Sequence, residues 1–234
     1  MPAIAEYPII VPTQIVAPLI KDAFTGLKNK SALKKVAEAQ ATETKALENA
    51  QKLDIPDGLP LIDKIKLKVN SNKYAESMVK EVNELEAKAK ADGEKFLNKF
   101  MKSKKNYKVD IQDNYYNTEY YCNNFGRLQY VRETNEKGIT TIAKVNHSKY
   151  RLYDGAYYNS GSNGIEWEIK LKDNKLISLK KQGQTAFKEN LSSRTINGKY
   201  QKFNDGTITK TFYGNDYNNI TLKYKPDGTL EINR

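Results

Sequence analysis

The fold is decided by residues 200–231, which read YQKFNDGTITKTFYGNDYNNITLKYKPDGTLE. Runs of aromatic and β-branched residues surround Asn204-Asp205-Gly206, and similar runs surround Pro226-Asp227-Gly228. Asn, Asp and Gly tolerate the positive φ that hairpin loops need, whereas the flanking residues suit strands. The stretch therefore predicts successive β-hairpins.

The same turn chemistry recurs throughout the chain after residue 106. Further tetrads are Asn123-Asn124-Phe125-Gly126, Asn135-Glu136-Lys137-Gly138 and Lys172-Asp173-Asn174-Lys175. The segments between the turns are predicted strands: Arg127–Thr134, Ile139–Asn146, Ile165–Leu171, Leu176–Lys181, Thr207–Tyr213, Ile220–Tyr224 and Thr229–Ile232. Turns at this spacing predict an antiparallel β-meander of roughly eight to ten strands, either closed as a barrel or left as an open sheet.

Composition divides the chain near Lys102–Asn106. Of the 16 tyrosines only Tyr7 and Tyr74 precede residue 106, whereas alanine is concentrated before it. Ala, Lys, Glu and Leu lose little rotamer freedom in a helix, and Tyr, Thr and Ile suit a pleated surface. The sequence therefore predicts an α+β protein with three regions: an extended arm (1–12), a helical region (13–105) and an antiparallel β-domain (106–234).

Within the helical region, apolar residues at steps of three and four predict helices over 13–27, 31–53 and 72–101. Residues 54–60 hold two prolines and a glycine and predict a loop, and 61–69 predicts a short helix, although its alternation would also suit a strand. The apolar stripe of 31–53 is thin. We therefore expect 31–53 and 72–101 to form an antiparallel helical hairpin, which closes into a small bundle or takes partners from another chain.

The N-terminal arm is apolar but has no period that would let it fold alone. Its large apolar side chains would leave a strip in water unless a neighbouring subunit covers them. We therefore predict that the arm binds a partner through five residues: Ile4, Tyr7, Ile9, Ile10 and Val11.

Few residues suit catalysis or metal binding. One cysteine, Cys122, and one histidine, His147, exclude an internal disulfide and the common zinc spacings. A Cys–His nucleophilic pair is conceivable, and Glu166 and Glu168 have the i, i+2 spacing of a carboxylate pair on a strand, but solvent-facing strand charges are the simpler interpretation. We therefore expect a protein that is not an enzyme, with no catalytic residue, no cofactor and no metal.

The net charge of +11 favours a polyanionic partner, but the excess is divided almost evenly between the two halves of the chain. A local concentration near the predicted helix end offers possible phosphate contacts: Lys99, Lys102, Lys104, Lys105 and Lys108. No window approaches the apolar length of a membrane-spanning helix, and the N-terminus lacks the basic region of a signal peptide. We expect cytoplasmic synthesis.

Tyrosines occur in adjacent pairs in the β-domain. Neighbouring residues of a strand point to opposite faces, so at least some of these rings are expected to be exposed, although cross-strand pairs that stabilise the sheet would explain them equally well. Exposed tyrosines can stack on sugars or bases, or anchor a protein interface. The possible surface-binding residues are Tyr115, Tyr116, Tyr120, Tyr121, Tyr157 and Tyr158.

Two segments resemble the aromatic–x–Asn/Asp-Gly–x–Ile/Leu hairpin units of MORN-like repeat proteins. They are Tyr200–Thr209 and Leu222–Glu231, with a weaker match at Tyr121–Tyr130. The spacing is irregular and the Gly-Glu-Trp element of MORN repeats is absent, so the resemblance implies hairpins only. As a whole, an apolar arm, a lysine-rich helical hairpin and a Tyr/Asn-rich β-domain are similar to minor structural proteins, associated with the tail or capsid, of tailed-phage virions.

This resemblance implies a non-enzymatic structural or adaptor subunit of a virion, docked to other protein subunits through its arm and helices in a homo- or hetero-oligomer. The basic charge and the tyrosines leave two alternatives. One is a nucleic-acid-binding module, whose binding would fall steeply with salt. The other is a domain that binds carbohydrate or a cell surface.

Overall fold

The computed structural model divides the chain into two compact units, residues 1–53 and 54–234. It describes residues 37, 38, 41, 53–113, 117–153, 156–160, 164–214 and 219–234. In the first unit, residues 37, 38 and 41 are helical, as the predicted helix over 31–53 requires. The predicted arm and the helix over 13–27 lie outside the described residues.

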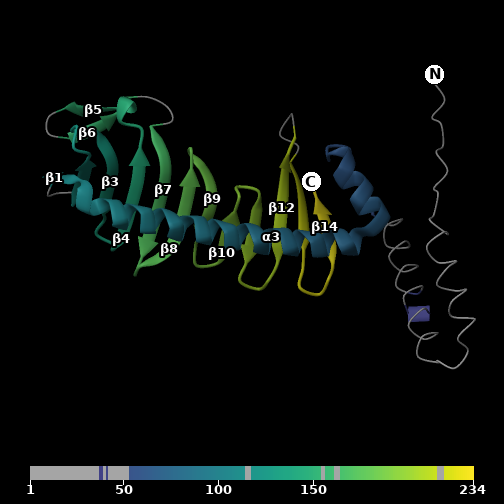
Figure 1. The fold of residues 1–234 in the computed structure, drawn as a ribbon. Coiled ribbons are helices and arrows are strands. Elements are labelled where there is room, and N and C mark those ends of the chain that lie inside the picture. Colours follow the sequence, from purple (N-terminus) through teal and green to yellow (C-terminus); the bar gives the residue numbers. More distant parts are fainter. Residues whose placement is uncertain are drawn as a thin grey trace, which may run out of the picture. The chain divides into compact units, whose positions relative to one another are not determined.

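The second unit consists of one long helix and a large antiparallel sheet (Figure 1). The helix α3 spans Leu61–Ser103 and ends in a short 3-10 turn, η1 (Lys104–Asn106). The sheet contains, in order, β1 (Lys108–Asp113), β2 (Thr118–Cys122), β3 (Leu128–Thr134), β4 (Ile139–Val145), β7 (Ile165–Lys172), β8 (Lys175–Lys181), β9 (Gln184–Glu189), β10 (Ser193–Ile196), β11 (Tyr200–Phe203), β12 (Ile208–Tyr213), β13 (Asn219–Tyr224) and β14 (Leu230–Asn233).

The predicted α+β class with an antiparallel β-meander is confirmed. Each strand pairs with the next strand of the chain, except that the turn η2 (His147–Lys149) and the hairpin β5 (Tyr150–Tyr153)–β6 (Ala156–Asn159) interrupt the path from β4 to β7. The order ends at β1 and β14, so the sheet is open. It has 12 strands, more than predicted, because short strands such as β10 and β11 offer too little pattern to detect.

The turns follow the chemistry read from the sequence. In the turn from Asn123 to Gly126, the Asn123 N–H donates to the Arg127 carbonyl at 3.0 Å, and the Gly126 N–H donates to the Asn123 carbonyl at 2.9 Å. The tetrads that end at Gly138, Gly206 and Gly228 repeat this pattern. All four glycines have φ between 70° and 88°, which a side chain would disfavour. The two segments that resemble MORN units are accordingly hairpins.

The register divides the sheet into two faces with opposite character. On the face that α3 covers, directly paired residues form a mainly apolar row across β2 to β14, here called the helix-face row. It consists of Glu119, Arg132, Ile142, Ile169, Leu179, Phe187, Ile196, Tyr200, Lys210, Leu222 and Ile232. The opposite face is called the open face.

The main core lies between α3 and the helix-face row. Met78 and Val82 of α3 and Leu179 and Phe187 of the sheet are at most 1% exposed and belong to the same apolar cluster. Each such side chain contributes about 1.5–3 kcal/mol by leaving water. The predicted boundary near residue 105 therefore marks a change of secondary structure inside one compact unit.

The helix is continuous where the sequence predicted separate helices over 61–69 and 72–101. Asn70, Ser71 and Asn72 are weak helix formers but not helix breakers, and Ser71 is buried. Gly93 is also accommodated, because a Cβ atom there would lie 2.5 Å from Cδ2 of Leu176 on β8. Gly93 thus permits a close approach of helix and sheet.

The helix matches the sheet in length. At 1.5 Å per residue its 43 residues measure about 65 Å, and 12 strands spaced about 4.8 Å apart span about 53 Å. Figure 1 shows α3 crossing the whole row of strands, with its first turns bent from the axis of the remainder. One helix therefore covers the full width of the sheet.

Candidate binding surface

The open face carries a second cross-strand row, one residue away from the helix-face row in every strand. This open-face row is polar throughout, in contrast to the apolar row behind it. It consists of Thr118, Glu133, Thr141, Lys170, Ser178, Lys188, Thr195, Gln201, Thr209, Lys223 and Glu231. The row thus forms a polar track perpendicular to the strands across eleven of the twelve strands, in which Thr118 and Ser178 are buried.

The cations on the helix face are engaged in contacts between helix and sheet. Glu86 of α3 is 7% exposed, and its carboxylate lies 2.8 Å from Lys90 Nζ, 3.4 Å from an Arg194 nitrogen and 3.6 Å from Lys202 Nζ. Burial acts to raise the pKa of the Glu86 carboxyl, but the three cations outweigh it and hold that pKa below its usual value. The cluster fixes α3 on β10 and β11.

Other helix-face cations are held by acids and aromatic rings. Lys181 pairs with Asp92 of α3 and lies 4.7 Å from the centre of the Trp167 ring. Lys210 donates to Tyr74 Oη at 3.4 Å and lies 4.9 Å from the Phe212 ring centre. These lysines are structural and are not available to a ligand.

The lysines of the open-face row form fewer ion pairs than the cations of the helix face. Lys170 and Lys188 form no ion pair with any residue that the structure describes. Lys223 lies 4.0 Å from Glu231, at the limit of an ion pair. The positive charge of Lys170 and Lys188 is therefore free to meet an external anion.

Two of the predicted surface tyrosines, Tyr120 and Tyr121, are buried. Tyr121 is fully buried under α3, where its ring centre is 5.1 Å from that of Phe100. Tyr120 points to the open face as expected, but the hairpin β5–β6 covers it, and its ring centre lies 5.1 Å from that of Tyr157. Neither ring of the pair Tyr120 and Tyr121 is therefore exposed to a ligand. Tyr115 and Tyr116 lie outside the described residues.

The hairpin β5–β6 exposes two tyrosines on its outer side. Tyr158 is 57% exposed, Tyr153 is 73% exposed, and their ring centres are 6.3 Å apart. Arg151 lies directly opposite Tyr158 in the register. Tyr158 was predicted from the sequence, whereas Tyr153 was missed because it has no tyrosine neighbour.

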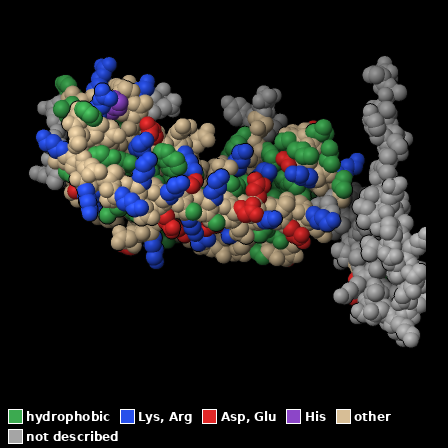
Figure 2. Space-filling view, in the orientation of Figure 1, with side chains coloured by type: hydrophobic (Ala, Val, Ile, Leu, Met, Phe, Trp, Pro, Cys, Tyr) green, Lys and Arg blue, Asp and Glu red, His purple; other side chains and the backbone are tan. Residues whose placement is uncertain are grey.

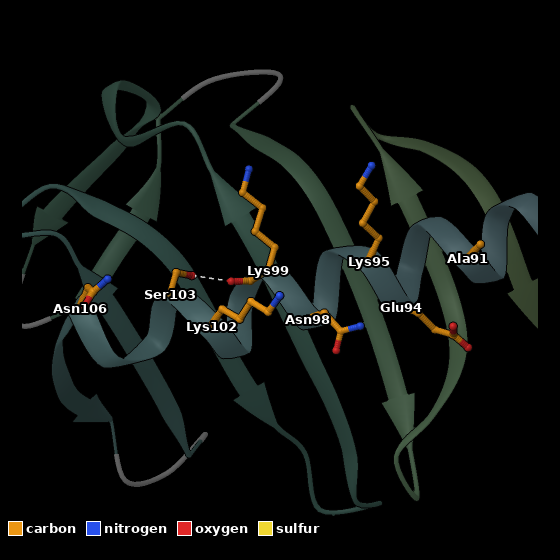
Figure 3. Close-up of a pocket in the computed structure, with 8 residues that line it drawn as sticks. All are labelled: Ala91, Glu94, Lys95, Asn98, Lys99, Lys102, Ser103 and Asn106. Atoms are coloured by element: carbon orange, nitrogen blue, oxygen red, sulfur yellow. Dashed lines mark hydrogen bonds between the residues drawn. The ribbon is translucent and has the colours of Figure 1, made fainter.

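The predicted lysine cluster does not converge on one site. Lys99 and Lys102 line a shallow groove of about 790 Å³ on the outer side of α3 (Figure 3). Lys104 lies over the Tyr121 ring, 5.9 Å from its centre, while Lys105 and Lys108 are exposed beyond the helix. The cluster is therefore distributed around the helix end.

Within the groove, Figure 3 shows Lys95 and Lys99 extending in parallel from one side of α3, with Glu94 and Asn98 pointing to the other side. All the lining residues belong to α3 and η1, so the sheet provides no wall. Figure 2 shows basic and acidic side chains interspersed over the described part of this side. The groove can attract an anion but has little shape to select one.

The residues considered as catalytic pairs from the sequence make other contacts in the structure. The Cys122 Sγ atom lies 3.7 Å from Tyr157 Oη in the second apolar cluster, and His147 is exposed in η2. Glu166 pairs with Lys144, and Glu168 lies 3.6 Å from Lys180 Nζ. Within the described residues, no group of three or more His, Cys, Asp or Glu side chains could hold a metal ion.

Comparison with protein-family models, curated proteins and solved structures gave no match to this chain. In the described part of the chain, no helix has the length and apolar character needed to cross a membrane.

The open-face row was not found by sequence analysis. Its residues are single polar positions spread over many strands, and nothing in the local sequence distinguishes them from ordinary exposed strand residues. The signal lies in the register: each turn length fixes which residues become neighbours across the strands. Assigning every turn first would have aligned these positions.

Proposed function

We propose that this protein is a non-enzymatic structural or adaptor subunit of a larger assembly, and that the open face of its sheet is a contact surface for a partner. One observation carries the proposal. The sheet uses one face for its core with α3 and leaves on the other a polar row that crosses β2 to β14.

The shape of the second unit supports a binding role. An open sheet of 12 strands backed by one helix offers a long, regular surface on which a partner can make contacts across many strands. The tyrosines Tyr153 and Tyr158 add an exposed aromatic site on the neighbouring hairpin. Docking through the N-terminal arm and residence in a phage virion stay predictions.

The nucleic-acid alternative is supported by the groove that Lys95, Lys99 and Lys102 line. The open face and this groove lie on opposite sides of the sheet, so variants can separate the two readings. If binding of the partner falls steeply as the salt concentration rises, and if substitutions in the groove alone weaken it, nucleic acid is the better explanation.

The test adds bulk and charge to one side at a time. Thr195→Glu with Thr209→Glu places two carboxylates in the open-face row, and Ala87→Glu with Ala91→Glu makes the same charge change on exposed positions of α3. We expect the open-face variant to be released from the assembly and the helix variant to remain in it. The measurement is the native size of the particle that contains each variant, in a lysate of the source cells. Retention of both variants would refute the proposal.

A further inference from the structure

Within the open-face row, short hydroxyl side chains and long polar side chains alternate from strand to strand. From β4 to β13 the residues are Thr141, Lys170, Ser178, Lys188, Thr195, Gln201, Thr209 and Lys223. Long side chains therefore recur at every second strand, a period of about 9.6 Å. No acidic residue interrupts this part of the row, because Glu133 and Glu231 lie beyond its two ends.

Resting on the proposed role of the open face, we propose that its partner is an extended acidic polysaccharide, laid across the strands along the open-face row. The charge pattern carries this assignment. Lys170 and Lys188 have no acidic partner among the described residues, whereas helix-face cations such as Arg194 and Lys181 are paired. The open face thus holds unneutralised positive charge at Lys170 and Lys188.

The spacing of that charge selects the class of polymer. Lys170 and Lys188 lie two strands apart, and Lys223 lies four strands beyond Lys188, because Gln201 occupies the position between them. These intervals of about 9.6 and 19 Å suit a chain with one anionic group in every two sugar units, because an extended disaccharide has a length comparable to the shorter interval. Duplex DNA carries one negative charge per about 1.7 Å of its axis and would leave most phosphates unmatched. Binding single strands without sequence preference relies on aromatic stacking, and the row from Thr141 to Lys223 contains no aromatic residue.

The side chains between the cations suit sugar hydroxyl groups. Ser, Thr and Gln can each donate and accept a hydrogen bond, as a sugar hydroxyl does. Thr195, Gln201 and Thr209 lie half-exposed on three successive strands. Gln201 is already oriented, because its Nε2 donates to Ser193 Oγ at 2.9 Å. The row therefore offers hydroxyl and amide groups between Lys188 and Lys223, whereas Ser178, between Lys170 and Lys188, is buried.

The test measures binding of the full chain to hyaluronate, which has one carboxylate in every disaccharide, with neutral dextran and single-stranded DNA as comparison polymers. We expect hyaluronate alone of the three to bind. Fragments long enough to run from Lys170 to Lys223, about 29 Å, should bind far more tightly than a single disaccharide.

A charge-matched pair of variants locates the site. Lys170→Gln, Lys188→Gln and Lys223→Gln together should weaken hyaluronate binding at least about tenfold, since each substitution removes one charge contact with the polymer. The control combines Lys88→Gln, Lys95→Gln and Lys99→Gln on the outer side of α3, and should leave binding nearly unchanged.

Several outcomes would overturn the inference: no binding of hyaluronate by the unaltered chain, equal binding of single-stranded DNA, or equal weakening by both triple variants. The proposed function is tested separately, through release of the Thr195→Glu and Thr209→Glu variant from its native assembly. If that variant is released and hyaluronate does not bind, the open face is a contact surface for a different partner and the polysaccharide assignment is wrong.

Discussion

Phe96 of α3 and Trp167 of β7 stack with their planes 10° apart and their ring centres 5.9 Å apart. The same Phe96 ring is tilted against Tyr130 of β3, with centres 6.1 Å apart. A single side chain of the helix thus contacts strands on either side of β4. The C-terminal half of α3 is held on the sheet by aromatic contacts, whereas its middle is held by the ion pairs of Glu86.

Phe96→Ala should destabilise the second unit by about 3–5 kcal/mol, since it leaves a cavity between Trp167 and Tyr130. Urea unfolding followed by tryptophan fluorescence measures this, because the protein has one tryptophan. The matched control is Phe125→Ala, at a side chain that is 85% exposed in the turn after β2, and it should change stability by less than about 0.5 kcal/mol. Equal effects of the two changes would show that Phe96 is not a core contact.

Gly93→Ala should fail to stabilise α3, although alanine in a helix is normally favoured over glycine by about 1 kcal/mol. The reason is the close approach of Leu176, which the new methyl group would displace. A double-mutant cycle with Leu176→Ala measures the conflict: in the background with the smaller side chain, Gly93→Ala should become favourable. A gain of about 1 kcal/mol in the unaltered background would contradict the predicted clash.

Glu86→Gln should destabilise the protein at pH 7 by about 1–3 kcal/mol, because it removes the charge that three cations share. The pKa of Glu86 is lowered in the folded state, so its contribution is complete above the usual value of 4.5 and is lost as the pH falls below it. Urea unfolding at pH 7 and pH 3.5 should therefore show the difference between the two proteins shrinking in acid. A difference that stays constant would contradict the assigned charge interaction.

Glu94→Gln is the control for this prediction. Glu94 is exposed on the outer side of α3, so its replacement should have little effect at either pH.

Glu119 retains its own acid dependence in both proteins. Burial acts to raise its pKa, but Tyr121, Arg132 and Lys104 outweigh it and lower that pKa.

A fragment of residues 54–234 should unfold cooperatively, whereas residues 106–234 alone should aggregate or remain poorly folded. The shorter fragment lacks α3 and exposes the apolar part of the helix-face row, including Phe187 and Ile196, to water. Circular dichroism and analytical ultracentrifugation of both fragments test this. A monomeric, cooperatively folded β-domain of residues 106–234 would show that the sheet does not need its helix.

The β-meander could be predicted from the sequence because its turns are local. The tetrads ending at Gly126, Gly138, Gly206 and Gly228 specify the direction of the chain within a few residues, and the structure confirms each hairpin. The helix over 72–101 was also predicted, from its apolar period. Its packing was not, because the same stripe suits a partner helix or a sheet equally well.

The candidate binding surface was not predicted, because the exposure of its residues depends on segments that are distant in the sequence. Whether Tyr120 is exposed depends on the hairpin β5–β6, which lies more than twenty residues further along the chain and folds back over the open face. Sequence alternation correctly assigned Tyr120 and Tyr121 to opposite faces, but alternation does not reveal what covers a face. The same holds for the lysines, whose availability depends on partners on other strands.

Because α3 covers the whole sheet, the length of the helix and the width of the sheet cannot vary independently during evolution. Duplicating one hairpin would widen the sheet by about 9.6 Å, and about six further helical residues would be needed to shield it. Loss or gain of a hairpin without a compensating change in α3 would leave an uncovered apolar strip or an unsupported helix end. The length of the helix therefore limits the number of strands that the sheet can contain.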